Sequence, residues 1–116
     1  MSRTASRSRT TAETTIELFV DLDGTGKCDV STGIPFYDHM LTQVGKHGGF
    51  DLRIAAKGDI HIDTHHTVED VAITFGEAIR EALGDKSGVR RFASGLYPLD
   101  EALIEIALDL SGRPFV

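Results

Sequence analysis

Two adjacent histidines followed by two adjacent acids form the segment of this sequence best suited to chemistry. The segment is His65-His66-Thr67-Val68-Glu69-Asp70. Residues four apart share one face of a helix, so His65 would lie beside Glu69 and His66 beside Asp70. Neighbouring helix positions point about 100° apart, which lets the two imidazoles serve two ions. The pattern predicts half of a dinuclear metal site, although a hydrated helix N-terminus that favours acids could have the same sequence.

A third histidine, His39, is a candidate ligand of the same kind. It lies next to Asp38, whose carboxylate could orient the imidazole ring. Imidazole and carboxylate ligands suit Mn, Fe, Ni or Zn better than Mg or Ca, which prefer oxygen shells. The alternative is a histidine at the edge of the core that binds no metal. We expect His47 and His61 to stay outside the site, since one ends a helix and the other alternates with isoleucines.

Length, charge and cysteine content restrict the class of protein. The chain has 116 residues, a net charge of −6 and one cysteine, Cys28. A domain of this size can bury roughly two-thirds of its unfolded surface. The acidic balance argues against a nucleic-acid surface, which needs clustered Lys and Arg. A single cysteine fits a reducing cytoplasm, and no apolar run approaches the roughly 18 residues of a membrane span.

Segments of alternating apolar residues predict strands, and a segment at the N-terminus with few apolar residues predicts a disordered tail. Residues 1–11 are rich in Ser, Thr and Arg, and we expect residues 1–12 to form a disordered tail. Alternation predicts strands near residues 16–22, 50–54, 60–62 and 102–110, with residues 88–99 as a candidate for another.

Two helices are expected between these strands. The first begins near Pro35, and the second follows a cap at Asp63 or Thr64 and ends at Gly84. The predicted buried stripe of the second helix is Val68, Val71, Ala72, Phe75, Ile79 and Ala82. The paired histidines border that stripe, where side chains can be partly desolvated and still reach a ligand. We therefore expect an α+β fold of about four strands with two helices packed on one face.

Several segments together resemble the imidazoleglycerol-phosphate dehydratase family, which removes water from imidazole glycerol phosphate in histidine biosynthesis. They are Glu13-Thr14-Thr15-Ile16, Leu22-Asp23-Gly24-Thr25-Gly26, residues 32–41, residues 65–70, and Ser111-Gly112-Arg113-Pro114. The resemblance implies a unit of four strands and two helices that the family duplicates in tandem and assembles into hollow shells. Residues 13–116 would form a single such half-repeat, and we expect no internal repeat within the chain.

The resemblance also implies roles for individual residues. The metal ligands would be His39, His65, His66 and Glu69, with two Mn²⁺ ions per completed site and Zn²⁺, Fe²⁺ or Ni²⁺ as alternatives. Glu13 would be the catalytic acid/base and Asp100 an acid that holds neighbouring groups in place. Arg91 and Arg113 would bind the substrate phosphate, since guanidinium groups bind oxyanions through paired hydrogen bonds. Metal bound to the substrate's imidazole would stabilise the charge left when a weakly acidic carbon loses its proton.

The motif with paired histidines occurs once, so we expect a second copy of the chain to complete the site. The expected partners are the chain itself, as a homo-oligomer, and an imidazole-containing phosphate, with no nucleic acid and no membrane. Two alternatives stay open. One is a folded half-fragment that binds metal without turnover, and the other is an unrelated hydrolase that uses a metal-bound water.

Overall fold

The computed structural model describes residues 2–116, which form two compact units divided after Gly84. The first unit contains strands β1 (Thr4–Thr10), β2 (Thr14–Asp21), β3 (Cys28–Ser31) and β4 (Asp51–Gly58), with helices α1 (Pro35–Gly48) and α2 (His65–Leu83). The second unit contains strands β5 (Phe92–Leu99) and β6 (Ala102–Asp109). Neither helix is long and apolar enough to cross a membrane within the described residues.

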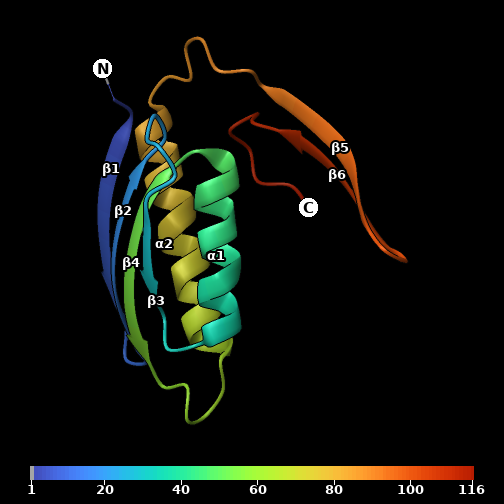
Figure 1. Ribbon diagram of the computed structural model, residues 1–116. Helices are drawn as coiled ribbons and strands as arrows, with labels where there is room; N and C mark the ends of the chain where they lie inside the picture. The colour runs from blue at the N-terminus through green and yellow to red at the C-terminus, as the bar shows by residue number, and fades with distance from the viewer. Residues whose placement is uncertain (1) are drawn as a thin grey trace. The chain divides into compact units, whose positions relative to one another are not determined.

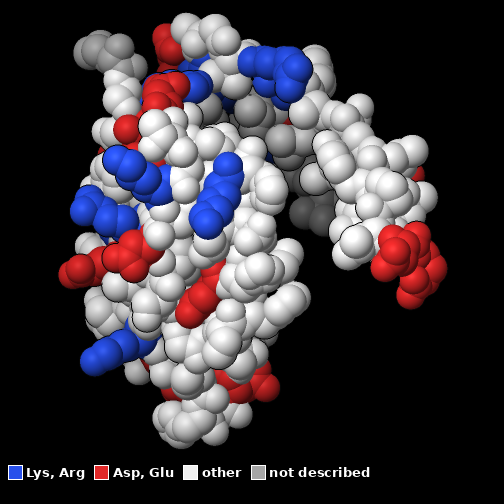
Figure 2. Space-filling view, viewed as in Figure 1, with Lys and Arg blue, Asp and Glu red and all other residues white. Residues whose placement is uncertain are grey.

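A four-stranded sheet with both helices on one face makes up the first unit (Figure 1). The strand order is β1-β2-β4-β3, antiparallel except for the β3–β4 pair. Alternate residues of β2 and β4 point into the core with residues of both helices; they include Ile16, Leu18, Val20, Leu52, Ile54, Leu41, Val71 and Ala78. The predicted α+β fold, with two helices on one face of about four strands, is confirmed. Figure 2 shows Lys and Arg interspersed with Asp and Glu on the face of this unit that it draws.

The N-terminal segment is an ordered edge strand, and the prediction of a disordered tail is wrong for residues 4–10. Strand β1 pairs with β2 along its whole length. Its single buried apolar residue, Ala5, packs into the core, and its arginines bind acids of α2: Arg7 with Glu81 and Arg9 with Asp70. Polar residues held by pairing and ion pairs carry no hydrophobic alternation, so the pattern was uninformative here. Met1 lies outside the described residues.

Two other strand assignments also differ. Residues 60–62 form a turn in which the Ile62 N–H donates to the Asp59 carbonyl at 2.8 Å, and the Ile62 side chain is exposed. The remaining strand of the sheet is instead β3, which is four residues long. So short a segment is dominated by its pairing with β4 rather than by its own periodicity.

Helix α2 begins as predicted, but its buried face is shifted from the predicted stripe, of which Val68, Phe75 and Ile79 are only partly buried and Ala72 is exposed. The Asp63 carboxylate accepts the N–H of His65 at 2.8 Å, the first residue of the helix. The buried residues are Thr67, Asp70, Val71, Thr74, Ala78 and Ala82, so only Val71 and Ala82 of the predicted stripe are buried. Small and β-branched residues at these positions allow α2 to lie close to the sheet. A prediction that assigns the largest apolar residues to the buried face does not identify them.

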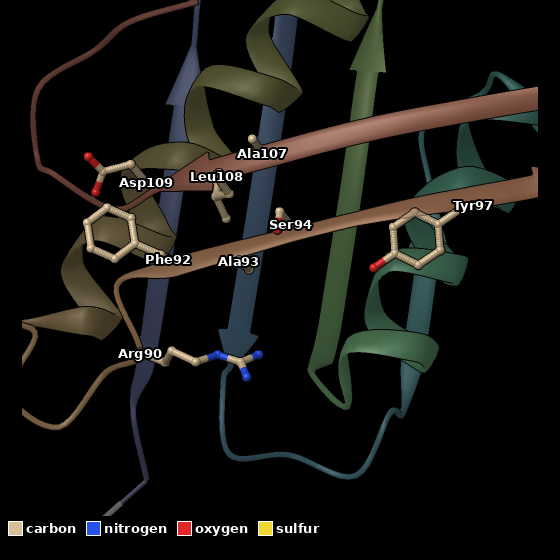
Figure 3. A pocket seen from close by; sticks show the side chains of 8 residues that line it. All are labelled: Arg90, Phe92, Ala93, Ser94, Tyr97, Ala107, Leu108 and Asp109. Atoms are coloured by element: carbon tan, nitrogen blue, oxygen red, sulfur yellow. The ribbon is translucent and has the colours of Figure 1, made fainter.

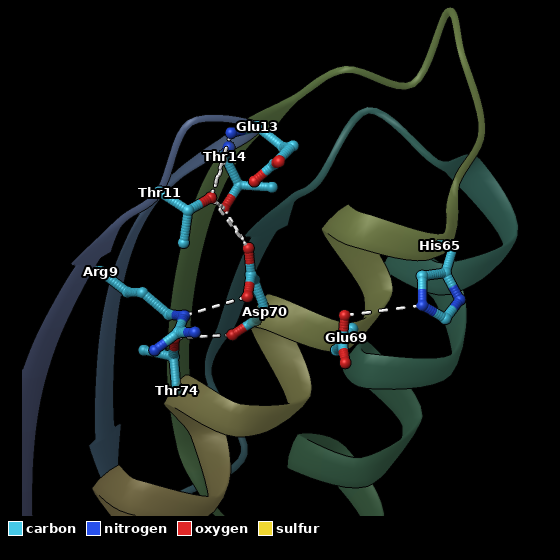
Figure 4. Close-up of polar contacts among 8 residues, drawn as sticks. All are labelled: Arg9, Thr11, Glu13, Thr14, His65, Glu69, Asp70 and Thr74. Atoms are coloured by element: carbon cyan, nitrogen blue, oxygen red, sulfur yellow. Dashed lines mark hydrogen bonds and ion pairs between the residues drawn. The ribbon is translucent and has the colours of Figure 1, made fainter.

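A buried carboxylate, Asp70, ties α2 to the turn between β1 and β2 (Figure 4). It accepts hydrogen bonds from the Thr14 hydroxyl at 2.5 Å, the Arg9 Nε at 3.0 Å and the Thr11 hydroxyl at 3.2 Å. These bonds lower the pKa of Asp70, the Thr14 hydroxyl contributing most, so the residue is held as a carboxylate. The β1–β2 turn, which carries Glu13, is thereby fixed to the first turns of α2.

A glycine at the end of β4 allows that strand to reach the same helix. A Cβ on Gly58 would overlap the Thr67 hydroxyl of α2 and crowd Thr14 of β2. The absence of a side chain therefore lets the chain pass closely over the start of α2 and places Asp59 beside it.

The second unit repeats the β1–β2 hairpin. Its two antiparallel strands have the register of β1 and β2 with 88 added to every residue number: Thr4 pairs with Asp21, and Phe92 with Asp109. The hydrogen bond from the Leu22 N–H to the Arg3 carbonyl recurs from Leu110 to Arg91. Identical residues at this offset are Arg3/Arg91, Ala5/Ala93, Ser6/Ser94, Glu13/Glu101, Ile16/Ile104, Glu17/Glu105, Asp21/Asp109, Leu22/Leu110 and Gly24/Gly112. The expectation that the chain holds no internal repeat is wrong.

The repeated hairpin lacks the cover that the first one has. Ile16 and Val20 of β2 are 0% exposed, whereas their counterparts Ile104 and Leu108 are 64% and 50% exposed. Figure 3 shows a pocket on this hairpin, lined by Arg90, Phe92, Ala93, Ser94, Tyr97, Ala107, Leu108 and Asp109. Within residues 85–116, nothing corresponds to β4 or α2.

We predict that Asp70→Ala lowers the free energy of unfolding by about 2–4 kcal/mol, because it leaves the Thr14 hydroxyl and the Arg9 guanidinium without their acceptor. Urea denaturation followed by far-UV circular dichroism measures the change. Asp29→Ala, at an exposed position of β3, is the control and should change stability by less than about 0.5 kcal/mol. Equal effects of the two substitutions would contradict the importance of the buried network.

Gly58→Ala should destabilise the protein by about 1–3 kcal/mol, since the added methyl group must displace Thr67 or the end of β4. Gly76→Ala is the matched control: it lies within α2 with open space around it, and the change should stabilise by about 0.5–1 kcal/mol. Thermal unfolding of both variants tests the pair. A Gly58→Ala protein as stable as the parent would refute the close approach.

Candidate active site

Three segments meet at one end of the first sheet. Because Thr14 pairs with Gly58 across antiparallel strands, the residues just beyond them, Glu13 and Asp59, also come together. The Asp59 N–H donates to the Glu13 carbonyl at 3.1 Å. The Asp59 carboxylate in turn lies 2.9 Å from Nδ1 of His66 in the first turn of α2. The predicted acid/base Glu13 and the predicted ligand His66 are thus joined through one residue.

The second histidine of the pair does not contact the acid expected from helical spacing. Asp70 points to the sheet, and His66 is bound instead by Asp59 from the loop after β4. The pKa of His66 is raised, chiefly because it donates a hydrogen bond to that carboxylate. Partial burial opposes the shift, and the negative charges of Asp59, Glu13 and Glu69 add to it. Asp59 is therefore the acid that contacts this imidazole, at 2.9 Å, while Glu13 and Glu69 add only their negative charge.

The first histidine of the pair has the geometry that helical spacing predicts. His65 Nε2 lies 3.5 Å from the Glu69 carboxylate, one helical turn away, and both side chains are exposed (Figure 4). Exposed ion pairs of this kind add little to stability. Breaking the His65–Glu69 contact to bind a ligand would therefore cost little free energy.

His39 and its neighbour behave differently from expectation. His39 lies on α1 with an exposed side chain. Asp38 does not orient it: the Asp38 carboxylate accepts the N–H of Thr32 at 2.8 Å and its hydroxyl at 2.5 Å, which fixes the loop before α1. His47, expected to be a bystander, lies 3.0 Å from the Gln43 amide oxygen, and His61 is in an exposed turn. No three potential ligands converge within residues 2–116.

The donor set at the start of α2 fits a divalent transition metal. Imidazole nitrogen and carboxylate oxygen occur in adjacent pairs, the combination that Mn, Fe, Ni and Zn accept. With Nδ1 of His66 bound to Asp59, its Nε2 is the nitrogen that remains for a metal.

The sequence did not identify Asp59 and Asp70 as residues that hold the site together. Asp70 was visible in the motif, but only the fold shows that it faces the sheet.

The predicted phosphate-binding residues gather in the second unit around an aspartate. Arg91 binds Asp109 with two hydrogen bonds, of 2.7 and 3.2 Å. The pKa of Asp109 is lowered mainly by Arg91, with the charges of Arg113 and Lys86 contributing. Three cations therefore lie near one another, and Lys86 was not predicted.

Asp100, predicted as a catalytic acid, lies in the turn between β5 and β6. It is exposed and adopts a left-handed backbone conformation, with φ of 50°. At the offset of 88 residues it corresponds to Ala12, and its neighbour Glu101 corresponds to Glu13.

Known proteins of one enzyme family match most of this chain. The family model for imidazoleglycerol-phosphate dehydratase matches residues 32–116. Imidazoleglycerol-phosphate dehydratase of Acidiphilium cryptum is 64% identical over 116 residues, which are 100% of this chain and 59% of the relative. The protein of that name from Parafrankia sp. is 60% identical over 115 residues, 99% of this chain and 59% of its own.

Two solved structures share the fold. The dehydratase from Staphylococcus aureus aligns with a TM-score of 0.83 and 32% identity, covering 97% of this chain and 60% of that one. The enzyme from Pyrococcus furiosus aligns with a TM-score of 0.78 and 38% identity, covering 93% and 56%. The chain spans somewhat more than half the length of these relatives. It belongs to the imidazoleglycerol-phosphate dehydratase family.

Proposed function

We propose that this chain provides the metal-ligand and acid–base part of an imidazoleglycerol-phosphate dehydratase site, acting in histidine biosynthesis in the cytoplasm. The reaction would eliminate water from imidazole glycerol phosphate and give imidazole acetol phosphate. The observation that carries the proposal is the meeting of Glu13, Asp59 and the His65-His66 pair at one end of the sheet. Family membership supports the same reaction.

The metal would be held by His39, His65, His66 and Glu69, with Mn²⁺ as the proposed ion. Bound metal would act as a Lewis acid that stabilises negative charge on the substrate's imidazole ring. His66 is prepared for this role because Asp59 holds its Nδ1, and the His65–Glu69 pair offers a nitrogen and an oxygen one helical turn apart. No three ligands meet within residues 2–116, so each ion would need ligands from a second copy of the chain.

The remaining residues would handle the proton and the phosphate. Glu13, whose backbone is fixed on one side by Asp59 and on the other by Thr11, would accept and return the proton through its carboxylate. Arg91 and Arg113 would bind the phosphate, which would compete with Asp109 for the guanidinium of Arg91. Asp100 would hold groups beside the site.

A combined binding and turnover experiment tests the proposal. With Mn²⁺ present, an imidazole-containing phosphate at about 100 times its Kd should raise the free energy of unfolding by about 2.7 kcal/mol. His65→Ala should abolish metal-dependent assembly and this protection, whereas His47→Ala, which loses only a contact with Gln43, should keep both. Conversion of imidazole glycerol phosphate by the parent protein completes the test. Equal metal content and assembly of the His65→Ala protein would overturn the assignment.

The uncovered hairpin favours a second candidate function, a metal-binding part without turnover of its own. Within residues 85–116, β6 has no strand beside its second edge and no helix over its apolar residues, whereas β2 pairs with β4 and is covered by α2. A site that needs this hairpin in place would then require another polypeptide segment.

Amide hydrogen exchange separates the two functions. In the metal-free chain, amides of β6 should exchange much faster than those of β2, which is paired on both edges. If metal-dependent association completes the site, β6 should become protected when Mn²⁺ is added. Continued fast exchange of the β6 amides in the metal-loaded protein would favour the second function, a metal-binding part that has no turnover of its own.

A further inference from the structure

We propose that Asp59 is a positioning residue that fixes both the ring of His66 and the turn that carries Glu13. It uses two different groups to do so, a side-chain carboxylate toward His66 and a backbone N–H toward Glu13. The proposal rests on the proposed function of those two residues and adds a role for a third that the motif does not contain.

The contact with His66 selects one form of the imidazole. A carboxylate can only accept a hydrogen bond, so Nδ1 of His66 must carry the proton at the 2.9 Å separation. In the neutral ring the lone pair then lies on Nε2, the nitrogen left to bind a metal. Hydrogen bonding of the other ring nitrogen to a carboxylate also makes an imidazole ligand more basic and restricts its rotation.

Burial makes Asp59 well suited to this role. Its side chain is 14% exposed, against 41% for His66, so the carboxylate forms the fixed side of the pair. Its other oxygen, Oδ1, is buried and accepts no hydrogen bond from residues 2–116. A buried oxygen without a partner is costly for stability, and such a cost is commonly retained where a group serves a site.

The contact with Glu13 comes from the sheet register. Asp59 is the residue that follows β4, and its N–H donates to the carbonyl of the residue that precedes β2. The close approach at Gly58 brings this residue over the start of α2. The loop after β4 therefore sets the distance between the turn of Glu13 and the histidine pair.

Nuclear magnetic resonance of the histidine ring nitrogens tests the role of the carboxylate without any metal. Long-range proton–nitrogen spectra of the neutral ring should show His66 in the parent protein with Nδ1 protonated. Asp59→Ala removes the acceptor and should shift His66 toward the form protonated on Nε2. Asp59→Asn, which keeps an acceptor oxygen, should restore the parent form. His66 protonated on Nε2 in the parent protein would overturn the proposal, and this measurement stands even if Asp59→Ala does not fold.

Metal affinity provides a second measurement. Titration with Mn²⁺, followed by the electron paramagnetic resonance of the free ion, should show binding about 10–100-fold weaker in Asp59→Ala, with Asp59→Asn in between. Asp63→Asn is the control, since it removes the same charge from the same loop but contacts only a backbone N–H; its affinity should match the parent. Unchanged affinity of a folded Asp59→Ala protein would refute the positioning role.

The two measurements distinguish this proposal from the function on which it rests. A parent protein that binds no Mn²⁺ but has His66 protonated on Nδ1 would contradict the proposed function and still support the role of Asp59. A parent protein that binds Mn²⁺ with His66 protonated on Nε2 would do the reverse.

Discussion

The buried carboxylate of Asp70 is the interaction on which the arrangement of the site depends. Helix α2 carries the paired histidines, and the β1–β2 turn carries Glu13, so the two segments are far apart in the sequence. Asp70 holds them together by accepting hydrogen bonds from Arg9, Thr11 and Thr14. A desolvated acceptor with three donors permits little relative movement, because separating the segments would leave buried polar groups without partners. Asp70, the last residue of the motif with paired histidines, thus has a structural role in holding these two segments together.

The hairpin of the second unit lacks the neighbouring strand and the helix that bury the matching hairpin of the first unit. Both hairpins have the same register, but only β2 has a neighbouring strand on its second edge and a helix over its apolar residues. An unpaired strand edge beside exposed Ile104 and Leu108 is a surface suited to pairing with further polypeptide. These exposed residues support the proposal that copies of the chain associate.

Local patterns predicted the helices well and the buried faces poorly. Pro35 and Asp63 mark the two helix starts because capping and proline chemistry are local. Strand β1 and the polar buried face of α2 depend on partners distant in sequence, such as Arg9 with Asp70, so neighbouring residues carry no sign of them. The His65–Glu69 pair followed from helical spacing, whereas the His66–Asp59 contact required the sheet register. The repeat escaped prediction because its nine identical residue pairs are scattered through the two hairpins, and only the shared register gives the offset of 88 residues a structural meaning.

Native mass spectrometry, with and without a metal chelator, is the sharpest test of the proposal that copies of this chain complete one another's metal sites. We expect a discrete oligomer that contains stoichiometric metal and dissociates when the metal is removed. A metal-free monomer under the same conditions, or an oligomer indifferent to chelation, would contradict it.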